Sequence, residues 1–204
     1  MIARALARLA RLISGASVHW TEPPTKARQR VYFGNHTSHL DFVVIWSALP
    51  PDVRARTRPV AGGDYWLRGA IRRYLASRVF KAILIERASA TSSPSQASRS
   101  IEQIATGMGD DRNIIVFPEG TRSMNGEVQV FKSGLYHLCK MKPDLELVPV
   151  YLANMNRILP KGEVLPVPLL GRVIFGAPMK MQSNEDKKVF LERARNALLE
   201  LRDR

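Results

Sequence analysis

Short apolar runs bounded by turn residues alternate along this chain with stretches in which apolar residues recur at helical spacing. The first pattern predicts buried strands and the second predicts helices. The predicted strands are 31–33, 56–60, 82–85, 113–117, 145–152 and 173–175. The predicted helices are 42–49, 64–78, 100–108, 133–141 and 185–201. This alternation predicts an α/β fold with a mixed, largely parallel sheet flanked by helices.

Two connecting segments lack this periodicity. The segment 21–30 is polar and predicts a linker, whereas 88–98 is rich in Ser, Thr and Ala and predicts a loop. Within the predicted helix 64–78, the side chains expected to be buried are Trp66, Ile71 and Leu75.

The first residues predict a basic amphipathic helix at the N-terminus. At about 100° per residue, its arginines share one narrow stripe: Arg4, Arg8 and Arg11. Its large apolar side chains lie on the opposite face: Ile2, Leu6, Leu9 and Ile13. Such a helix either packs on the domain or lies in a membrane interface. We expect membrane contact because the polar face is purely cationic, and we divide the chain into a contact helix (1–20) and a folded domain (21–204).

Composition narrows the class of protein. Apolar residues make up 45% of the 204 residues and charged residues 24%, which is an ordinary globular mixture. One cysteine excludes a disulfide framework and a cysteine-rich zinc site. No apolar run approaches the roughly 20 residues that a transmembrane helix needs.

The charge is distributed unevenly along the chain. The net charge is +13, and residues 1–100 hold 16 basic side chains against 5 acidic ones. A basic half of this kind favours a polyanionic partner: nucleic acid, an anionic membrane or an acidic protein.

A polar motif, Asn-His-Thr-Ser-His-Leu-Asp at 35–41, follows the strand 31–33. His36 and Asp41 would point about 140° apart on one continuous helix, so they meet only if His36 lies in the turn before the helix. A carboxylate on one ring nitrogen would let the other nitrogen remove a proton. The alternatives are an exposed polar turn and a metal site of His36, His39 and Asp41, which has no further ligand at suitable spacing.

A second polar motif, Phe-Pro-Glu-Gly-Thr-Arg-Ser at 117–123, follows the strand 113–117. Arg122 could grip a phosphate with its fork of donors, and Glu119 could accept a hydrogen bond from a hydroxyl. The alternative is a structural Glu–Arg pair. Because no Gly-x-Ser-x-Gly elbow is present, direct attack by a substrate hydroxyl is favoured over a covalent intermediate.

The two motifs together resemble those of the glycerolipid acyltransferase family, and most of all its bacterial 1-acylglycerol-3-phosphate acyltransferases. The resemblance covers about 31–150. It implies an O-acyltransferase of phospholipid biosynthesis that moves a fatty acyl group from acyl carrier protein or acyl-coenzyme A to a lysophospholipid, with lysophosphatidate converted to phosphatidate. It implies no metal and no bound cofactor, and it makes 21–204 the acyltransferase domain.

The resemblance also assigns residues by position. In the HX4D motif, His36 is the general base and Asp41 its partner. The acceptor site would comprise Glu119, Gly120, Thr121 and Arg122. Further phosphate ligands would be Arg87, after the strand 82–85, and Lys132, in the Phe-Lys-Ser-Gly segment at 131–134.

The acceptor is a lipid, so the enzyme is expected to act at an anionic membrane surface, as a peripheral protein of its cytoplasmic face. Two rival functions remain open. One is acylation of a lipid without phosphate, such as a lyso-ornithine lipid. The other is nucleic-acid binding, which the low aromatic content of 7% and the absence of a recognition motif disfavour.

Overall fold

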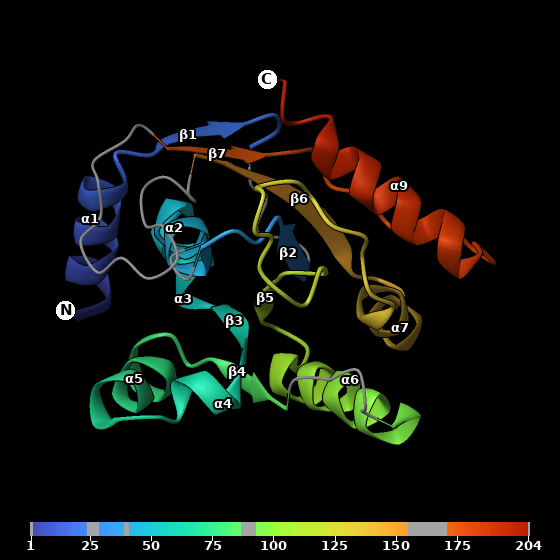
Figure 1. The fold of residues 1–204 in the computed structure, drawn as a ribbon, viewed down its shortest axis with the longest axis horizontal. Helices are drawn as coiled ribbons and strands as arrows, with labels where there is room; N and C mark the ends of the chain where they lie inside the picture. The colour runs from blue at the N-terminus through green and yellow to red at the C-terminus, as the bar shows by residue number, and fades with distance from the viewer. Residues whose placement is uncertain (1, 24–28, 39–40, 87–92, 155–170, 204) are drawn as a thin grey trace.

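The computed structural model describes residues 2–23, 29–38, 41–86, 93–154 and 171–203. Within them, seven strands form one sheet in the order β1-β7-β6-β2-β5-β3-β4 (Figure 1). The strands are β1 (Ser17–Trp20), β2 (Arg30–Gly34), β3 (Thr57–Gly62), β4 (Ile83–Ile85), β5 (Asn113–Val116), β6 (Glu146–Ala153) and β7 (Arg172–Phe175). Neighbouring strands run parallel, except that β6 and β7 are antiparallel. The predicted fold class, a largely parallel sheet flanked by helices, is confirmed.

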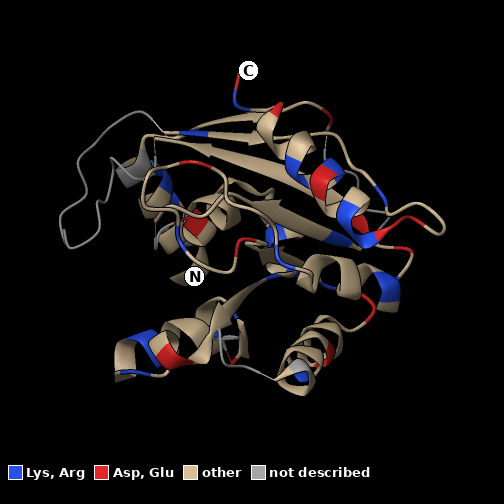
Figure 2. Cartoon of the chain, turned by 45° about the vertical axis from the view of Figure 1, so that its right-hand side comes forward, with Lys and Arg blue, Asp and Glu red and all other residues tan. Residues whose placement is uncertain are grey.

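Helices cover both faces of the sheet (Figure 1). The helices are α1 (Ile2–Ser14), α2 (Asp41–Ala48), α3 (Pro51–Ala55), α4 (Gly63–Trp66), α5 (Ala70–Tyr74), α6 (Pro94–Met108), α7 (Gly134–Met141) and α9 (Lys187–Leu199). Because side chains alternate along a strand, Val31 and Phe33 of β2 face α6, α7 and α9, whereas Tyr32 between them faces α2. α9, at the upper right of Figure 2, carries the basic residues Lys187, Lys188, Arg193 and Arg195 and one acidic residue, Glu192.

The N-terminal helix packs on the body of the protein. Ala7 is buried against α2, and the guanidinium of Arg11 donates to the carbonyl of Ser47 at 2.7 Å. The outer side of α1 exposes Ile2, Leu9 and Leu12. β1 follows at once and pairs with β7, so the sheet begins before the predicted boundary at residue 20. No helix in the described ranges has the length and apolar character that crossing a membrane requires.

The predicted helix 64–78 was wrong as one continuous element. It consists of α4, α5 and one π-helical turn at Leu75–Val79. Gly69 lies between α4 and α5 with a φ of 85°, a left-handed conformation that breaks the helical path. The expected burial of Ile71 is therefore wrong, since 77% of it is exposed.

The predicted loop 88–98 was also partly wrong. α6 begins at Pro94, where Ser93 and Gln96 form a reciprocal capping box. The Ser-Pro-x-Gln pattern carries both start signals, a capping Ser and a Pro in the first turn. The polar composition of the segment concealed these signals.

Candidate functional site

The loop after β2 is held at the carboxyl edge of the sheet by Asn35. Its side-chain amide donates to the carbonyl of Leu152 at 2.9 Å and accepts from the N–H of Leu152 at 2.8 Å. The asparagine side chain therefore extends the ladder between β2 and β6 by one more pair of bonds. This directs the residues that follow out of the sheet.

The next residue, His36, pairs with Asp41 at the first position of α2. Nδ1 of His36 lies 2.9 Å from Oδ2 of Asp41. The same oxygen accepts the backbone N–H groups of Thr37 at 2.6 Å and Ser38 at 2.8 Å. Asp41 is fully buried, whereas 18% of the His36 side chain is exposed. The carboxylate therefore orients the imidazole and favours the tautomer that leaves Nε2 able to accept a proton.

The second motif packs directly on this pair. The ring of Phe117 stacks on the imidazole of His36, with centroids 4.2 Å apart and planes 15° apart. Oε1 of Glu119 accepts the backbone N–H of His36 at 2.8 Å, and the N–H of Ser123 donates to the carbonyl of His36 at 2.7 Å. The turn thus holds the imidazole and both backbone polar groups of His36.

Glu119 is a bracing residue in this geometry. Only 2% of it is exposed, and its second oxygen, Oε2, accepts the N–H of Gln129 at 3.0 Å. Desolvation by burial raises the pKa of its carboxyl group, against the lowering effect of the hydrogen bonds from Gln129 and His36. Because both oxygens are taken up by backbone donors, Glu119 ties the loop after β2 to the chain before α7.

Gly120 and Lys132 fit together beside the histidine. Gly120 has a φ of 72°, and a Cβ atom there would lie 2.9 Å from Cδ and Nζ of Lys132. The backbone N–H of Lys132 donates to the carbonyl of Pro118 at 2.9 Å. The absence of a side chain at Gly120 thus lets the lysine lie across the turn.

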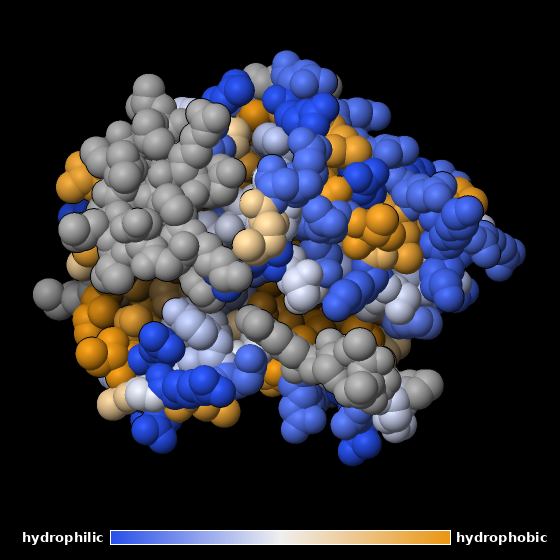
Figure 3. Space-filling view, in the orientation of Figure 1, coloured by the Kyte–Doolittle hydropathy of each residue, from blue (hydrophilic) through white to orange (hydrophobic). Residues whose placement is uncertain are grey.

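These residues border a cavity of about 810 Å³ with largely apolar walls. His36, Gly120 and Lys132 line it together with aliphatic and aromatic side chains of the strands and of α4, α6 and α7, among them Val60, Trp66, Ile85, Ile104 and Leu138. In Figure 3, apolar residues line a hollow between the lower layer, with α4 to α6, and the body above it. The space suits an aliphatic chain whose polar end lies at His36.

The remaining predicted residues differ in their placement. Thr121 and Arg122 lie in the same turn as Glu119, yet they do not line the cavity. Arg87 and His39 fall outside the described residues. In the part of the chain that is described, no group of three His, Cys, Asp or Glu side chains could hold a metal ion.

Asn35, Phe117 and Gln129 were not assigned a role from the sequence. Asn35 and Phe117 belong to the two motifs, and this position in the sequence could have identified them as residues of the site. Gln129 contributes a backbone N–H, so its residue type carries no signal.

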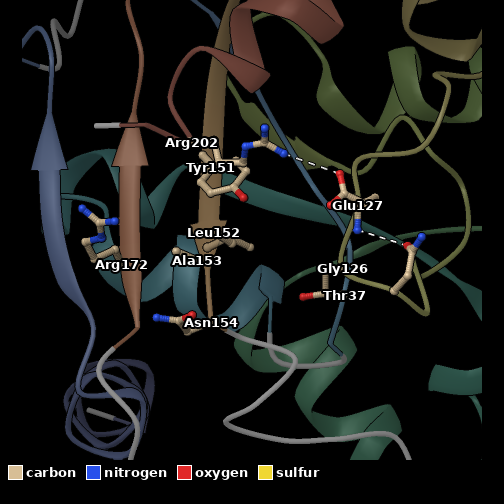
Figure 4. Close-up of a pocket in the computed structure, with 10 residues that line it drawn as sticks. Thr37, Gly126, Glu127, Tyr151, Leu152, Ala153, Asn154, Arg172 and Arg202 are labelled. Atoms are coloured by element: carbon tan, nitrogen blue, oxygen red, sulfur yellow. Dashed lines mark hydrogen bonds and ion pairs between the residues drawn. The ribbon is translucent and has the colours of Figure 1, made fainter.

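A second, polar pocket of about 330 Å³ is lined by Thr37, which follows His36 in the chain (Figure 4). Its charged side chains include Arg172 and Arg202, from β7 and from the segment after α9. Arg202 pairs with Glu127 at 3.5 Å, as the dashed line in Figure 4 marks. The pocket does not include the imidazole of His36, so it is separate from the apolar cavity.

Comparison with known proteins bears on this geometry. A family model described as Acyltransferase matches residues 16–153. A 1-acyl-sn-glycerol-3-phosphate acyltransferase of Limnanthes douglasii is 31% identical over 151 residues, which are 70% of this chain and 48% of the relative. The 1-acyl-sn-glycerol-3-phosphate acyltransferase alpha of Homo sapiens is 27% identical over 171 residues, 83% of this chain and 57% of that relative.

A solved structure has the same fold. It is the 1-acyl-sn-glycerophosphate acyltransferase PlsC of Thermotoga maritima, with a TM-score of 0.71 and 20% identity over all of this chain and 79% of that one. The matched region spans about half the length of the Limnanthes relative.

Proposed function

This chain belongs to the acyltransferase family, and from that premise we propose that it moves a fatty acyl group from a thioester to the free hydroxyl of a lysophospholipid. The favoured reaction converts lysophosphatidate to phosphatidate, with acyl carrier protein or coenzyme A as the carrier. The names of the matched relatives support this substrate class. The observation that carries the proposal is the imidazole of His36, held by buried Asp41 at the wall of an apolar cavity.

The chemistry follows from the His36–Asp41 pair. Nε2 of His36 removes the proton of the acceptor hydroxyl as its oxygen attacks the thioester carbonyl carbon. The carbon–sulfur bond then breaks, and the leaving thiolate takes the proton from the imidazolium. Asp41 stabilises the imidazolium while it exists. A base placed in this way contributes about 10²–10⁴ in rate.

The acceptor end of the site contains positive charge. Lys132 lines the cavity beside His36, and Arg122 lies in the adjoining turn. An ammonium group and a guanidinium group suit a phosphate monoester. We propose that these two residues, with Arg87, bind the phosphate of lysophosphatidate. This charge favours a phosphorylated acceptor over a lyso-ornithine lipid.

We further propose that the protein acts as a peripheral protein at the cytoplasmic face of an anionic membrane. The lipid tails of the substrate make this necessary, because each methylene costs about 0.8 kcal/mol to transfer into water. The exposed apolar side chains of α1, Ile2, Leu9 and Leu12, together with Arg8 on the same helix, support contact with lipid.

The test supplies the purified protein with lysophosphatidate and either acyl carrier protein or coenzyme A thioesters. We expect phosphatidate with one of the donors, and a loss of about 10²–10⁴-fold in His36→Ala. His19→Ala is the matched control, because His19 is an exposed histidine on β1, away from the cavity. Full turnover by His36→Ala would refute the base, and acylation of lyso-ornithine lipid in place of lysophosphatidate would refute the acceptor.

A further inference from the structure

The segment 63–79, here called the hairpin, comprises α4, α5 and the π-helical turn at Leu75–Val79. No residue of α4 or α5 is buried. Large apolar side chains are nevertheless concentrated there: Leu67 is 55% exposed, Ile71 77% and Tyr74 47%. In Figure 3, apolar and hydrophilic residues lie side by side over these helices, at the lower left. A cluster of exposed apolar side chains marks a contact surface.

The charge around these side chains is almost wholly positive. The hairpin has four basic residues, Arg68, Arg72, Arg73 and Arg78, against one acidic residue, Asp64, and the basic Lys81 follows it closely. Arg72 lies over the ring of Tyr65, with its Cζ atom 4.4 Å from the ring centroid. All five basic side chains are exposed, so the surface of the hairpin is both apolar and cationic.

The inner side of the hairpin has a different role. Tyr65 and Trp66 line the apolar cavity beside His36. Trp66 also packs edge-on against Phe42 of α2, with centroids 5.4 Å apart, and Phe80 packs edge-on against Phe42 at 5.0 Å. Trp66 and the adjoining Phe80 therefore anchor the hairpin in the core, and the exposed Leu67 follows directly on a residue of the cavity wall.

We propose that the hairpin inserts Leu67, Ile71 and Tyr74 into an anionic lipid surface and so seats the cavity at the bilayer. This rests on the proposed function, because that function requires a lipid acceptor. Arginines near an anionic leaflet each favour binding, and apolar side chains beside them enter the acyl boundary. The hairpin is a lipid contact in addition to α1, and both lie along the left edge of the molecule in Figure 1.

A lipid surface fits these residues better than an acidic protein partner does. A protein interface would need a shaped surface that packs on all three apolar side chains, which lie on both sides of Gly69. A bilayer accepts them without shape complementarity. The exposed apolar residues of α1, Ile2, Leu9 and Leu12, suit the same kind of surface.

One experiment reports insertion at a single position. Ile71→Cys is labelled with an environment-sensitive nitrobenzoxadiazole dye, and Val189→Cys on α9 is the control, since Val189 is 55% exposed. The native Cys139 is buried, and burial raises the pKa of its thiol to about 12, so it stays unlabelled at neutral pH. With vesicles of phosphatidylcholine and phosphatidylglycerol, we expect a blue shift at position 71 that brominated lipids quench.

The outcomes separate the possible partners. A blue shift at position 71 and none at position 189 supports insertion of the hairpin. No shift with the anionic vesicles overturns the proposal. A shift on addition of acyl carrier protein but not of vesicles overturns it in favour of a protein partner.

A charge variant tests the binding energy separately from catalysis. Leu67→Asp/Ile71→Asp should lower vesicle affinity in sedimentation by about tenfold or more, whereas Val189→Asp should not change it. Neither residue lines the cavity, so turnover of a monomeric short-chain lysophosphatidate should persist. If Leu67→Asp/Ile71→Asp binds vesicles as tightly as the native protein does, the hairpin proposal is overturned and the proposed reaction is not. If the native protein inserts into vesicles but does not acylate lysophosphatidate, the proposed reaction is overturned and the hairpin proposal is not.

Discussion

The carboxylate of Glu119 holds the backbone of His36, although 83 residues separate them in the chain. The bond is 2.8 Å long, and the carbonyl of the same histidine accepts the N–H of Ser123 at 2.7 Å. The first motif therefore supplies the imidazole and Asp41, whereas the second fixes the peptide that carries the imidazole. The two motifs are therefore joined by hydrogen bonds into one unit, so the position of the imidazole depends on both of them.

Loss of the Glu119 carboxylate should lower both the free energy of unfolding and the rate of acyl transfer. Glu119→Ala leaves two backbone N–H groups, of His36 and Gln129, without the carboxylate that accepts from them, in hydrogen bonds that are both part-buried. At about 0.5–1.5 kcal/mol for each of the two hydrogen bonds, we expect a loss of about 1–3 kcal/mol in the free energy of unfolding. Glu192→Ala, at an exposed position on α9, is the control for denaturant unfolding. Equal unfolding midpoints for the two variants would contradict the bracing role.

The electrostatic role of Asp41 can be tested by a substitution that removes its charge and keeps its size. In Asp41→Asn the amide oxygen can accept the bonds from His36, Thr37 and Ser38, because one oxygen receives all three. These three bonds are kept, whereas the stabilisation of the imidazolium by a negative charge is lost. We expect kcat to fall by roughly 10²–10⁴-fold with little change in the acceptor KM. A fall in kcat/KM through KM alone would show that Asp41 acts on binding and not on the base.

The His36–Asp41 contact was predictable because both residues lie within one short loop, where local turn geometry decides whether they meet. The bracing by Glu119 was not, because it depends on the pairing of β2 with β5. Phe33 lies opposite Val116 in that pairing, which brings the two following loops to one edge of the sheet. Sequence reasoning placed Glu119 at the acceptor instead, and a direct contact between Glu119 and substrate stays a prediction.

The fold shows the same division between local and long-range information. The buried strands were found because their apolar runs are continuous, as in β2 and β5. β1 was missed because it is an exposed edge strand whose partner, β7, lies at the other end of the chain. The helix 64–78 failed at Gly69, because glycine readily adopts the positive φ of 85° that breaks the helical path, and the apolar spacing on both sides concealed this signal.

Cys139 should be chemically silent in the folded protein. It is buried on α7, and desolvation by burial raises the pKa of its thiol to about 12. The nucleophile is the thiolate, whose fraction at pH 8 is about 10⁻⁴ for such a pKa. Iodoacetamide should therefore modify Cys139 only as fast as the protein unfolds, as mass spectrometry can follow. Faster labelling in the absence of denaturant would reveal local opening of α7.

The acceptor phosphate can be located by comparing Lys132→Ala with Lys187→Ala. Lys132 lines the cavity beside His36, whereas Lys187 is an exposed lysine at the start of α9. A charged hydrogen bond contributes about 1.5–3 kcal/mol, so Lys132→Ala should raise the KM for lysophosphatidate by about tenfold or more. Arg122→Ala should do the same if its guanidinium turns toward the bound phosphate. In both variants kcat should change little, because the phosphate takes no part in the bonds that form and break at the acceptor hydroxyl.

An acceptor without a phosphate monoester is the control for this comparison of KM values. For a lysolipid that lacks the phosphate monoester, Lys132→Ala, Arg122→Ala and Lys187→Ala should all have the KM of the unmodified protein, since there is no phosphate charge to lose. A rise in KM that is equal for phosphorylated and unphosphorylated acceptors would instead mean that Lys132 shapes the cavity through its contact with Gly120. The phosphate would then have to be bound elsewhere.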